Sequence, residues 1–469
     1  QAGRQYHQTD NCYCLTVDDS REAWADLAYK TTMMFMSGGG VGCDYSNVRG
    51  YGSKLHRSGG ISSGPLPLIE MIDGIAAAAR QGGERRGANY ASLRWDHPDV
   101  QQFIQMKVAC DTLQHTNIST MFNQNWLDSI NSPTCGSSYI QSKYAFYNTL
   151  KHACMYGDPG FQFDWDNQVL RNACTEVISK DDCDSCCLGS VNVAAIDSIE
   201  ELSNVVNLGV LFLLCNTMYT DVPVIKVKQV KEQNRRLGLG LMGVGEWFVQ
   251  RRLDYGYNQR NHPSAENIGD WLRCYQQSSD NAADYWADKL SIHRPVATRA
   301  IAPTGTISIV GGHTTPGIEP IFHTAYQRTY NTLKTQVHSN GYHTTTIIDP
   351  IVSKWMEMGY NVSDIDTAYT LSQSIEGIER RLQFQAFCQR YVDNAISTTI
   401  NLPSYSEGAE DAIAPILLKY LPMLRGVTFY PDGRHDNQPV VPVDIKDALR
   451  MSLIEVKESD SCKGGSCGV

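Results

Sequence analysis

The sequence predicts an α/β fold, and two observations support this prediction. Strand-like and helix-like patterns alternate along the chain, as they do where helices connect the strands of a sheet. The chain has 469 residues, which fits either about three ordinary domains or one large α/β barrel. Because no linker stands out, we expect one domain over residues 1–454 and a flexible polar tail over residues 455–469.

Local patterns place the clearest elements. A helix is predicted over residues 67–80, where apolar residues recur on one helical face and Gly82 follows the end. A second helix is predicted over residues 384–395 for the same reason. The runs 296–301 and 398–402 are rich in β-forming residues and predict strands, the first leading into a small polar loop.

Composition excludes several classes of protein. Fifty acidic residues against forty basic ones give a net charge of −10, which argues against an extended nucleic-acid surface. The longest apolar run, residues 208–215, is too short to span a membrane and is typical of a core helix. The first residues show no apolar secretion signal. We therefore expect a cytoplasmic protein with no nucleic-acid or membrane partner.

Three glycine-rich segments invite comparison with nucleotide-binding loops. Residues 238–243 fit the G-x-G-x-x-G pattern, but the charged, helix-like residues before them favour close helix packing over dinucleotide binding. Residues 38–42 and 82–87 could expose backbone N–H groups to an anion, and Arg85 and Arg86 add cations suited to phosphate. The alternative for both is a flexible turn.

The chain has fifteen cysteines, an odd number, and it is far too long to be a small disulfide scaffold. The cysteines are either mostly reduced, buried thiols or include some that carry redox chemistry. Cys183 and Cys186 have the spacing of half a zinc site, but no second C-x-x-C exists, so a zinc-stabilised binding protein is the minor alternative. Cys462 and Cys467 lie in the glycine-rich tail, where accessible thiols are suited to thiol–disulfide exchange.

Residues 172–176 place an amide, a thiol and a carboxylate at alternating positions. In an extended loop Asn172, Cys174 and Glu176 point the same way. A thiol between a hydrogen-bonding amide and a potential general base is a catalytic arrangement.

Taken together, these segments resemble the catalytic (alpha) subunit of ribonucleotide reductases. The resemblance rests on seven motifs in the family's order. They are SGGGVG (37–42), QGGERRGAN (81–89), NACTE (172–176), APTGTIS (302–308), GIEPIF (317–322), YVDNAIS (391–397) and GVTFY (426–430). The family fold that this resemblance implies is a ten-stranded α/β barrel, two antiparallel halves of five parallel strands, with a central finger loop that carries the radical cysteine.

The resemblance implies roles for the finger-loop residues. Cys174 would hold a transient thiyl radical, Glu176 would act as general base and Asn172 would hydrogen-bond the ribose. The family usually has proline and glycine where this chain has Ala173 and Thr175, so the path of the loop backbone is in question. The implied reaction is the reduction of ribonucleoside diphosphates to 2′-deoxyribonucleotides for DNA synthesis.

The remaining cysteines receive redox roles by the same resemblance. Cys12 and Cys186 would form the reducing pair, with Cys187 as the alternative to Cys186. Cys462 and Cys467 would recharge this pair and accept electrons from a thioredoxin- or glutaredoxin-type protein. No metal ligand set is expected.

Binding residues also follow from the resemblance. The substrate would contact residues of two glycine-containing loops, namely Gly39, Gly40, Pro303, Thr304, Gly305, Thr306 and Ile307. A dNTP or ATP effector at a homodimer interface would contact Arg85, Arg86, Thr112 and Gln114. Only eleven residues precede Cys12, so we expect no ATP-cone domain and a short, phage-like form of the enzyme.

Two alternative sources of the radical are consistent with the resemblance. The tail motif resembles the class that uses a ferritin-like dimetal partner, and Tyr430 is the candidate radical-transfer residue towards it. In that case the chain itself would bind no cofactor. The barrel motifs resemble the adenosylcobalamin-dependent class, which is the alternative. Of these two sources, we predict the dimetal partner.

Overall fold

Five parallel strands form the first half of the fold in the computed structural model, which describes residues 8–56, 59–81, 85–108, 113–133, 136–256, 267–331, 342–433 and 440–451. Their order in the sheet is β1-β2-β5-β6-β7. The strands are β1 (Cys12–Thr16), β2 (Gly40–Asp44), β5 (Ala88–Arg94), β6 (Thr116–Asn123) and β7 (Gly160–Asp164). They are almost entirely buried, as expected for parallel strands covered on both faces.

The second half runs in the opposite direction. Strand β10 (Asp184–Asn192) pairs antiparallel with β1 and parallel with β11 (Leu237–Met242). At the other side, β15 (Gly426–Pro431) pairs antiparallel with β7 and parallel with β14 (Thr399–Leu402). The two halves of the sheet are therefore antiparallel to each other.

Residues 299–301 complete the ring between β11 and β14. Arg299 bridges Leu239 of β11, and Ile301 bridges Ile396, which lies just before β14, both in parallel. The amide of Ile301 bonds the carbonyl of Ala395, so main-chain hydrogen bonds continue across the gap. The predicted α/β barrel is confirmed: nine strands form one sheet, and the segment predicted as a strand over residues 296–301 closes the ring through isolated bridges instead of a regular strand.

The glycines of residues 238–243 have a different function from the one predicted. Gly238 and Gly240 lie in β11 and Gly243 lies between β11 and α8, so none of them is inside a closely packed helix. A Cβ on Gly240 would lie 2.5 Å from the carbonyl oxygen of Ala300, so only glycine lets the strand 299–301 approach. The helix expected before them is α7 (Ile225–Asn234), which ends before β11 begins.

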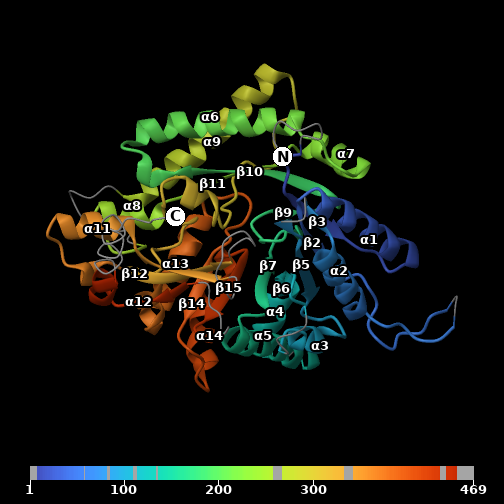
Figure 1. Ribbon diagram of the computed structural model, residues 1–469. Coiled ribbons are helices and arrows are strands. Elements are labelled where there is room, and N and C mark those ends of the chain that lie inside the picture. The colour runs from blue at the N-terminus through green and yellow to red at the C-terminus, as the bar shows by residue number, and fades with distance from the viewer. Residues whose placement is uncertain are drawn as a thin grey trace, which may run out of the picture.

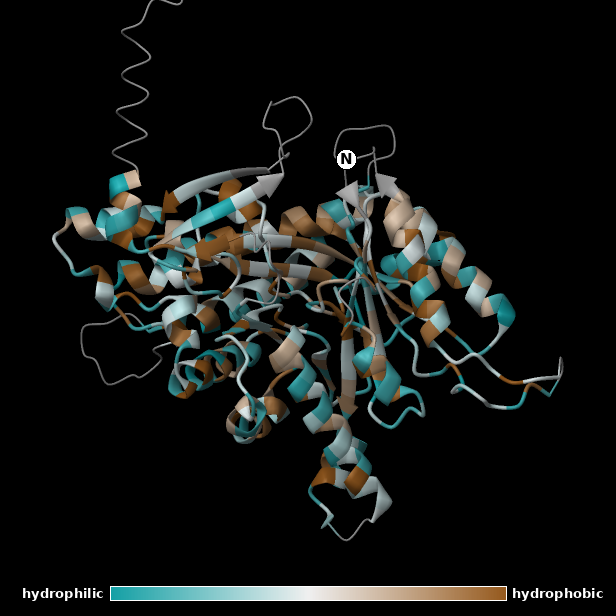
Figure 2. Cartoon of the chain, turned by 60° about the horizontal axis from the view of Figure 1, so that its bottom comes forward, coloured by the Kyte–Doolittle hydropathy of each residue, from teal (hydrophilic) through white to brown (hydrophobic). Residues whose placement is uncertain are grey.

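Helices cover the outside of the barrel (Figure 1). Helices α1 (Arg21–Met36) and α2 (Leu66–Ala78) lie beside the first half, and α6 (Ile199–Tyr219) and α9 (Ile268–Leu290) lie together beside β10. Figure 2 shows brown, apolar segments along the barrel strands and mixed colours along the outer helices. The other helices are α3 (Val100–Gln105), α4 (Gln124–Ile130), α5 (Ser137–Tyr156), α8 (Val244–Gln250), α10 (Ile307–Val310), α11 (Pro350–Glu357), α12 (Ala368–Ser372), α13 (Ile375–Gln389) and α14 (Ala409–Tyr420). The strands that are not part of the ring are β3 (Arg80–Gln81), β4 (Arg85–Arg86), β8 (Leu170–Arg171), β9 (Ile178–Ser179), β12 (Ala325–Asn331), β13 (Tyr342–Ile348) and β16 (Val440–Pro442).

One predicted helix is confirmed and the other is displaced. The helix predicted over residues 67–80 is α2. The helix predicted over residues 384–395 is α13, which begins nine residues earlier and ends at Gln389. The apolar residues after Gln389 belong to the turn that leads to the β-bridge at Ile396. They continue the apolar pattern of the helix because the turn is buried as well.

Helix α6 contains the apolar run of residues 208–215. Among the described helices it alone has the length and apolar composition that a membrane crossing requires, but core helices share these properties. Its inner residues Leu202, Val206 and Val210 are buried against the barrel in the same cluster as Leu239 of β11. Its composition is therefore explained by packing.

The large apolar cores lie outside the barrel wall, beneath the helices. One cluster lies between α6, α9 and β11, a second between α1, α2 and the first strands, and a third around β7, α5 and α14. Inside the barrel the described residues form a small apolar cluster, made of Cys12, Cys14, Leu170, Val177 and Cys186. The barrel interior is thus left for the loop between β7 and β10.

Candidate active site

The finger loop, which we define as residues 170–179, is a hairpin inside the barrel. Its two legs are β8 and β9, which pair antiparallel. Cys174 lies at the tip and is exposed, whereas Asn172 and Glu176 on either side are buried. Thr175 has φ +68, in the left-handed region that favours glycine, and its amide bonds the carbonyl of Asn172 at 3.1 Å. The loop therefore forms without glycine at this position, with threonine in an unusual conformation.

The glycines of β2 make room for this loop. A Cβ on Gly42 would lie 2.0 Å from the carbonyl oxygen of Arg171, and one on Gly40 would lie 2.9 Å from Cβ of Ala173. Gly39 lies against the ring of Tyr13. The structure thus gives residues 39–42 a packing function, and the phosphate contact expected of Gly39 and Gly40 stays a prediction.

Replacing Gly42 with alanine is expected to displace the finger loop. The new methyl group would overlap main-chain atoms, which cannot rotate away, and overpacking of this kind costs about 1–3 kcal/mol. Urea unfolding would measure the loss. Gly74→Ala in α2 is the matched control, since nothing lies within 4 Å of its Cβ and alanine favours helices. Equal stability of the two variants would contradict this account.

A buried carboxylate lies behind Cys174. The side-chain amide of Asn172 donates to Oε1 of Glu176 at 2.9 Å, and the thiol of Cys12 lies 3.7 Å from the same oxygen. Burial raises the pKa of Glu176 to about 6. Its other oxygen, Oε2, has no hydrogen-bond partner among the described residues. The carboxylate is therefore poised to accept a proton near neutral pH.

Cys12 and Cys186 lie opposite each other on the antiparallel strands β1 and β10. Directly opposed residues have Cβ atoms about 4.5–5.5 Å apart, close to the separation that a disulfide needs. Both thiols lie in the interior cluster, where burial raises the pKa of each. The predicted pair is thus brought together beside Glu176.

Cys187 points to the other face of β10. It belongs to the core beneath α6, and the side-chain amide of Asn216 donates to its sulfur at 2.6 Å. Adjacent strand residues face opposite sides of the sheet, so of these two cysteines only Cys186 faces Cys12. Cys183 lies in a third cluster, behind the first strands. Throughout the part of the chain that the structure describes, no group of three or more potential ligands could hold a metal ion, so the zinc alternative has no site there.

A cavity of about 630 Å³ opens at Cys174. Its wall contains two residues predicted for nucleotide binding, Pro303 and Gln114, and the predicted radical-transfer residue Tyr430 at the end of β15. The predicted phosphate loop, residues 302–308, follows strand 299–301 and turns into α10 at Ile307. Thr304 has φ +52, and its hydroxyl accepts a hydrogen bond from the amide of Gly317 at 2.9 Å. Gly305 and Thr306 complete the turn before α10.

Part of the predicted set lies outside the residues that the structure places. Thr112, Cys462 and Cys467 are not among the described residues, and for Arg85 and Arg86 only the backbone of β4 is described. The effector site and the tail thiols therefore stay predictions.

Sequence reasoning missed an ion pair in the cavity wall. Nζ of Lys107 lies 2.9 Å from a carboxylate oxygen of Asp158 and 3.0 Å from the carbonyl oxygen of Thr116. Lys107 thus connects the start of β6 with the turn before β7, and both Lys107 and Gln114 line the cavity. No motif or spacing signals this contact, because the partners meet only when the strands align.

Comparisons with known proteins identify the family of the chain. A family model described as "Ribonucleotide reductase, barrel domain" matches residues 10–132, 122–268 and 294–418. The chain is 26 % identical to a vitamin B12-dependent ribonucleoside-diphosphate reductase of Mycobacterium tuberculosis, over 97 % of this chain and 72 % of that protein. It is 25 % identical to a protein of Mycobacterium phage D29, provisionally named an adenosylcobalamin-dependent ribonucleoside-triphosphate reductase, over 99 % of this chain and 77 % of that protein.

The fold has a solved counterpart. The alpha subunit of the Actinobacillus ureae class Id ribonucleotide reductase superposes with a TM-score of 0.70 and 17 % identity, over 92 % of this chain and 85 % of that one. At this identity the similarity supports the barrel fold alone.

The prediction of a ferritin-like dimetal partner is wrong. The relatives that align with most of the chain are named as vitamin B12- or adenosylcobalamin-dependent reductases, a class that needs no such subunit. The prediction rested on the tail motif, and Tyr430, its candidate radical-transfer residue, lies in the cavity wall. With the barrel, the finger loop and a family match over most of its length, the chain belongs to the ribonucleotide reductases.

Proposed function

We propose that this chain is an adenosylcobalamin-dependent ribonucleotide reductase that reduces ribonucleoside diphosphates. The observation that carries the proposal is the naming of its relatives, whose matches cover 92–99 % of the chain for four of them. The diphosphate is chosen because the first three of these relatives are named diphosphate reductases.

The cavity at Cys174 fits this cofactor class. The thiol is exposed at the cavity, and the wall around it is largely uncharged, with Tyr156, Gly157, Thr428 and Tyr430 on the side of β15. Lys107 is a charged group of this wall, and it is paired with Asp158. A ligand without net charge could therefore approach Cys174 without burying an unpaired charge of the protein. When bound, adenosylcobalamin supplies an organic radical by homolysis of its cobalt–carbon bond.

The residues of the chain divide the chemistry between them. Cys174 would remove the 3′ hydrogen atom of the ribose, and Glu176 would accept the 3′-hydroxyl proton. Asn172, already bonded to Glu176, would orient the ribose. Cys12 and Cys186 would supply two electrons and two protons, so that the 2′-hydroxyl leaves as water and the thiols become a disulfide. Cys462 and Cys467 would reduce that disulfide from the tail.

An activity assay tests the proposal. The purified chain, prereduced with dithiothreitol, is mixed with a ribonucleoside diphosphate and adenosylcobalamin, and deoxynucleotide is measured by chromatography. We expect product only when the cofactor is present. Turnover without adenosylcobalamin, or a preference of more than tenfold for the triphosphate, would contradict the respective part of the proposal.

Replacing Cys186 and Cys187 separately is expected to give different results. Cys186→Ser removes half of the disulfide-forming pair, so deoxynucleotide should not accumulate even with excess dithiothreitol. Cys187→Ser removes a thiol on the opposite face of β10, and turnover should stay within about threefold of the original, as for a change outside the site. Loss of turnover in both variants at equal folding, judged by circular dichroism, would count against the assignment.

A further inference from the structure

A buried ion pair lies beside the finger loop and belongs to none of the predicted sites. Asp184 at the start of β10 is 0 % exposed and Arg236, just before β11, is 4 % exposed. Nε of Arg236 lies 2.8 Å from Oδ2 of Asp184. Because removing two charges from water costs about as much as their attraction returns, stability alone is a weak reason for such a pair. Its other contacts point to a different reason.

The ion pair holds β9, the leg of the finger loop that follows Glu176, through hydrogen bonds. The hydroxyl of Ser179 donates to Oδ2 of Asp184 at 2.7 Å, and the guanidinium of Arg236 donates to Oδ1 of Asn394 at 3.1 Å. The same Asn394 oxygen accepts the amide of Ile178 at 3.4 Å. Two consecutive residues of the leg that follows Glu176 are thus held by one network centred on Arg236 and Asp184.

The loop is also tied to the second half of the barrel next to this network. The amide of Ala395 donates to the carbonyl of Glu176 at 2.8 Å, and the side-chain amide of Asn394 donates to the carbonyl of Arg299 at 2.9 Å. The position of the Glu176 main chain therefore depends on Asn394, which Arg236 orients.

The pair also adjoins the reducing thiols. Asp184 precedes Cys186 by two residues and lies on the same face of β10, opposite Cys14 while Cys186 lies opposite Cys12. A Cβ placed on Gly238, the second residue of β11, would lie only 3.1 Å from Sγ of Cys186. The sulfur of Cys186 therefore lies against β11, the strand that follows Arg236 directly. The amide of Cys187 bonds the carbonyl of Arg236 at 3.4 Å.

The two thiols have different electrostatic surroundings. Burial raises the pKa of both, and Glu176 raises both further. Only for Cys186 does a cation act against the burial, and that cation is Arg236. The groups whose charges bear on Cys186 are Arg236 before β11, Cys187 on β10, Glu176 on the finger loop, and Asp10 and Cys12 on or next to β1.

We propose that Arg236, held by Asp184, is a positioning residue that keeps the Glu176 leg of the finger loop in place and makes Cys186 the thiol of the pair that reacts first. The inference rests on the proposed function for its purpose, but not for its test. When the pair is oxidised, Cys186 loses its proton and its sulfur forms a bond to the oxidant. Cys12 then loses its proton, its sulfur attacks the sulfur of Cys186, and the bond to the oxidant breaks. Two electrons pass to the oxidant with two protons, and one S–S bond forms.

The test uses diamide, a small oxidant that needs neither nucleotide nor cofactor. Two thiols reduce its N=N bond to a hydrazine while they form a disulfide, and the rate follows the thiolate fraction. The full chain is reduced, exposed to diamide between pH 7 and 10, quenched with acid and alkylated under denaturing conditions. The Cys12–Cys186 disulfide is then measured by mass spectrometry.

The variants separate charge from hydrogen bonding. Arg236→Gln leaves Asp184 buried without its cation and is expected to lose stability, so Arg236→Gln/Asp184→Asn provides a neutral pair that keeps the fold. Arg236→Lys keeps the charge without the planar fork. Arg299→Gln is the matched control, because Arg299 is also 4 % exposed and ion-paired, to Asp280 and Asp393.

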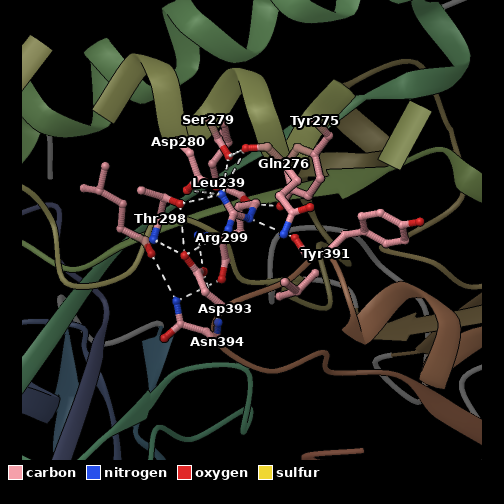
Figure 3. Close-up of polar contacts among 12 residues, drawn as sticks. Leu239, Tyr275, Gln276, Ser279, Asp280, Thr298, Arg299, Tyr391, Asp393 and Asn394 are labelled. Atoms are coloured by element: carbon pink, nitrogen blue, oxygen red, sulfur yellow. Dashed lines mark hydrogen bonds and ion pairs between the residues drawn. The ribbon is translucent and has the colours of Figure 1, made fainter. Parts of the chain in front are cut away.

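Figure 3 shows why this control is suitable. The side chain of Arg299 bonds residues of α9 and the segment 391–393, with Nη1 at 2.6 Å from the hydroxyl of Ser279 and Nε at 2.8 Å from the carbonyl of Tyr391. These bonds hold the barrel wall, and none of them reaches a cysteine or the finger loop.

We expect the double variant to form the disulfide about tenfold more slowly at pH 8 than Arg299→Gln, with the pH profile moved upwards by about one unit. Arg236→Lys should keep the profile. Hydrogen exchange at the amide of Ile178 should be at least fivefold faster in Arg236→Lys and in the double variant than in the control. An unchanged rate and profile would overturn the thiol role, and unchanged exchange would overturn the positioning role. Failure of the cofactor-dependent assay alone would instead count against the proposed function.

Discussion

Cys174→Ser is expected to abolish deoxynucleotide formation while nucleotide binding persists. The serine O–H bond is stronger than the S–H bond, so the hydroxyl cannot replace the thiol as the group that forms a radical and removes a hydrogen atom from carbon. Because the other thiols of the interior cluster lie behind the loop, none is placed to take over at the tip. We expect the rate to fall by about 10⁴-fold or more, the scale of losing the reacting group of an enzyme.

Two measurements distinguish this result from misfolding. Calorimetric titration with a ribonucleoside diphosphate should give a Kd within about threefold of the original, since the substitution removes no predicted phosphate contact. Cys215→Ser in α6, a partly exposed cysteine far from the loop in the fold, should leave turnover intact. Deoxynucleotide formation by Cys174→Ser above one-hundredth of the original rate would refute the role of this thiol.

Glu176→Gln is expected to have the second largest effect. Glutamine keeps the size and can keep the hydrogen bond with Asn172, but it cannot accept a proton. Removing a general base costs typically about 10²–10⁴-fold in rate, and we expect a fall in kcat with little change in KM.

The pH dependence of the unmodified chain provides an independent check. Burial raises the pKa of Glu176 to about 6, so the folded protein favours its neutral form below that pH. The rate limited by proton acceptance should therefore fall about tenfold for each unit below pH 6 and become level above it. The rate of the Glu176→Gln variant should not show this fall below pH 6, which is the acidic limb of the pH–rate profile. Glu379→Gln in α13, a carboxylate paired with Lys419 at the surface, should retain it. A limb that persists in Glu176→Gln would assign the titration to another group.

Some features could be predicted because they depend on neighbours in the sequence. The helix α2 follows from a local apolar period with stop signals, and the Asn172, Cys174 and Glu176 arrangement follows from alternation within five residues. The helix at α13 was displaced because the apolar period continues beyond Gln389 into a turn that is equally buried.

The choice of radical source could not be made from such local signals. The tail motif favoured a dimetal partner, and the relatives that match most of the chain contradict it. The cavity wall contains Tyr430 at a position that any barrel strand end could occupy, so the residue alone carried little information.

By itself the sequence determined the α/β class, the finger-loop triplet and the family, since each rests on order and spacing along the chain. Only the tertiary structure decided that Cys186 and not Cys187 faces Cys12, that Gly42 clears the path of Arg171, and that Arg236 with Asp184 holds the loop. These contacts join residues that are up to about 170 positions apart, such as Cys12 and Cys186. Strand register and closure of the barrel set them, and neither is encoded in the spacing of any one segment.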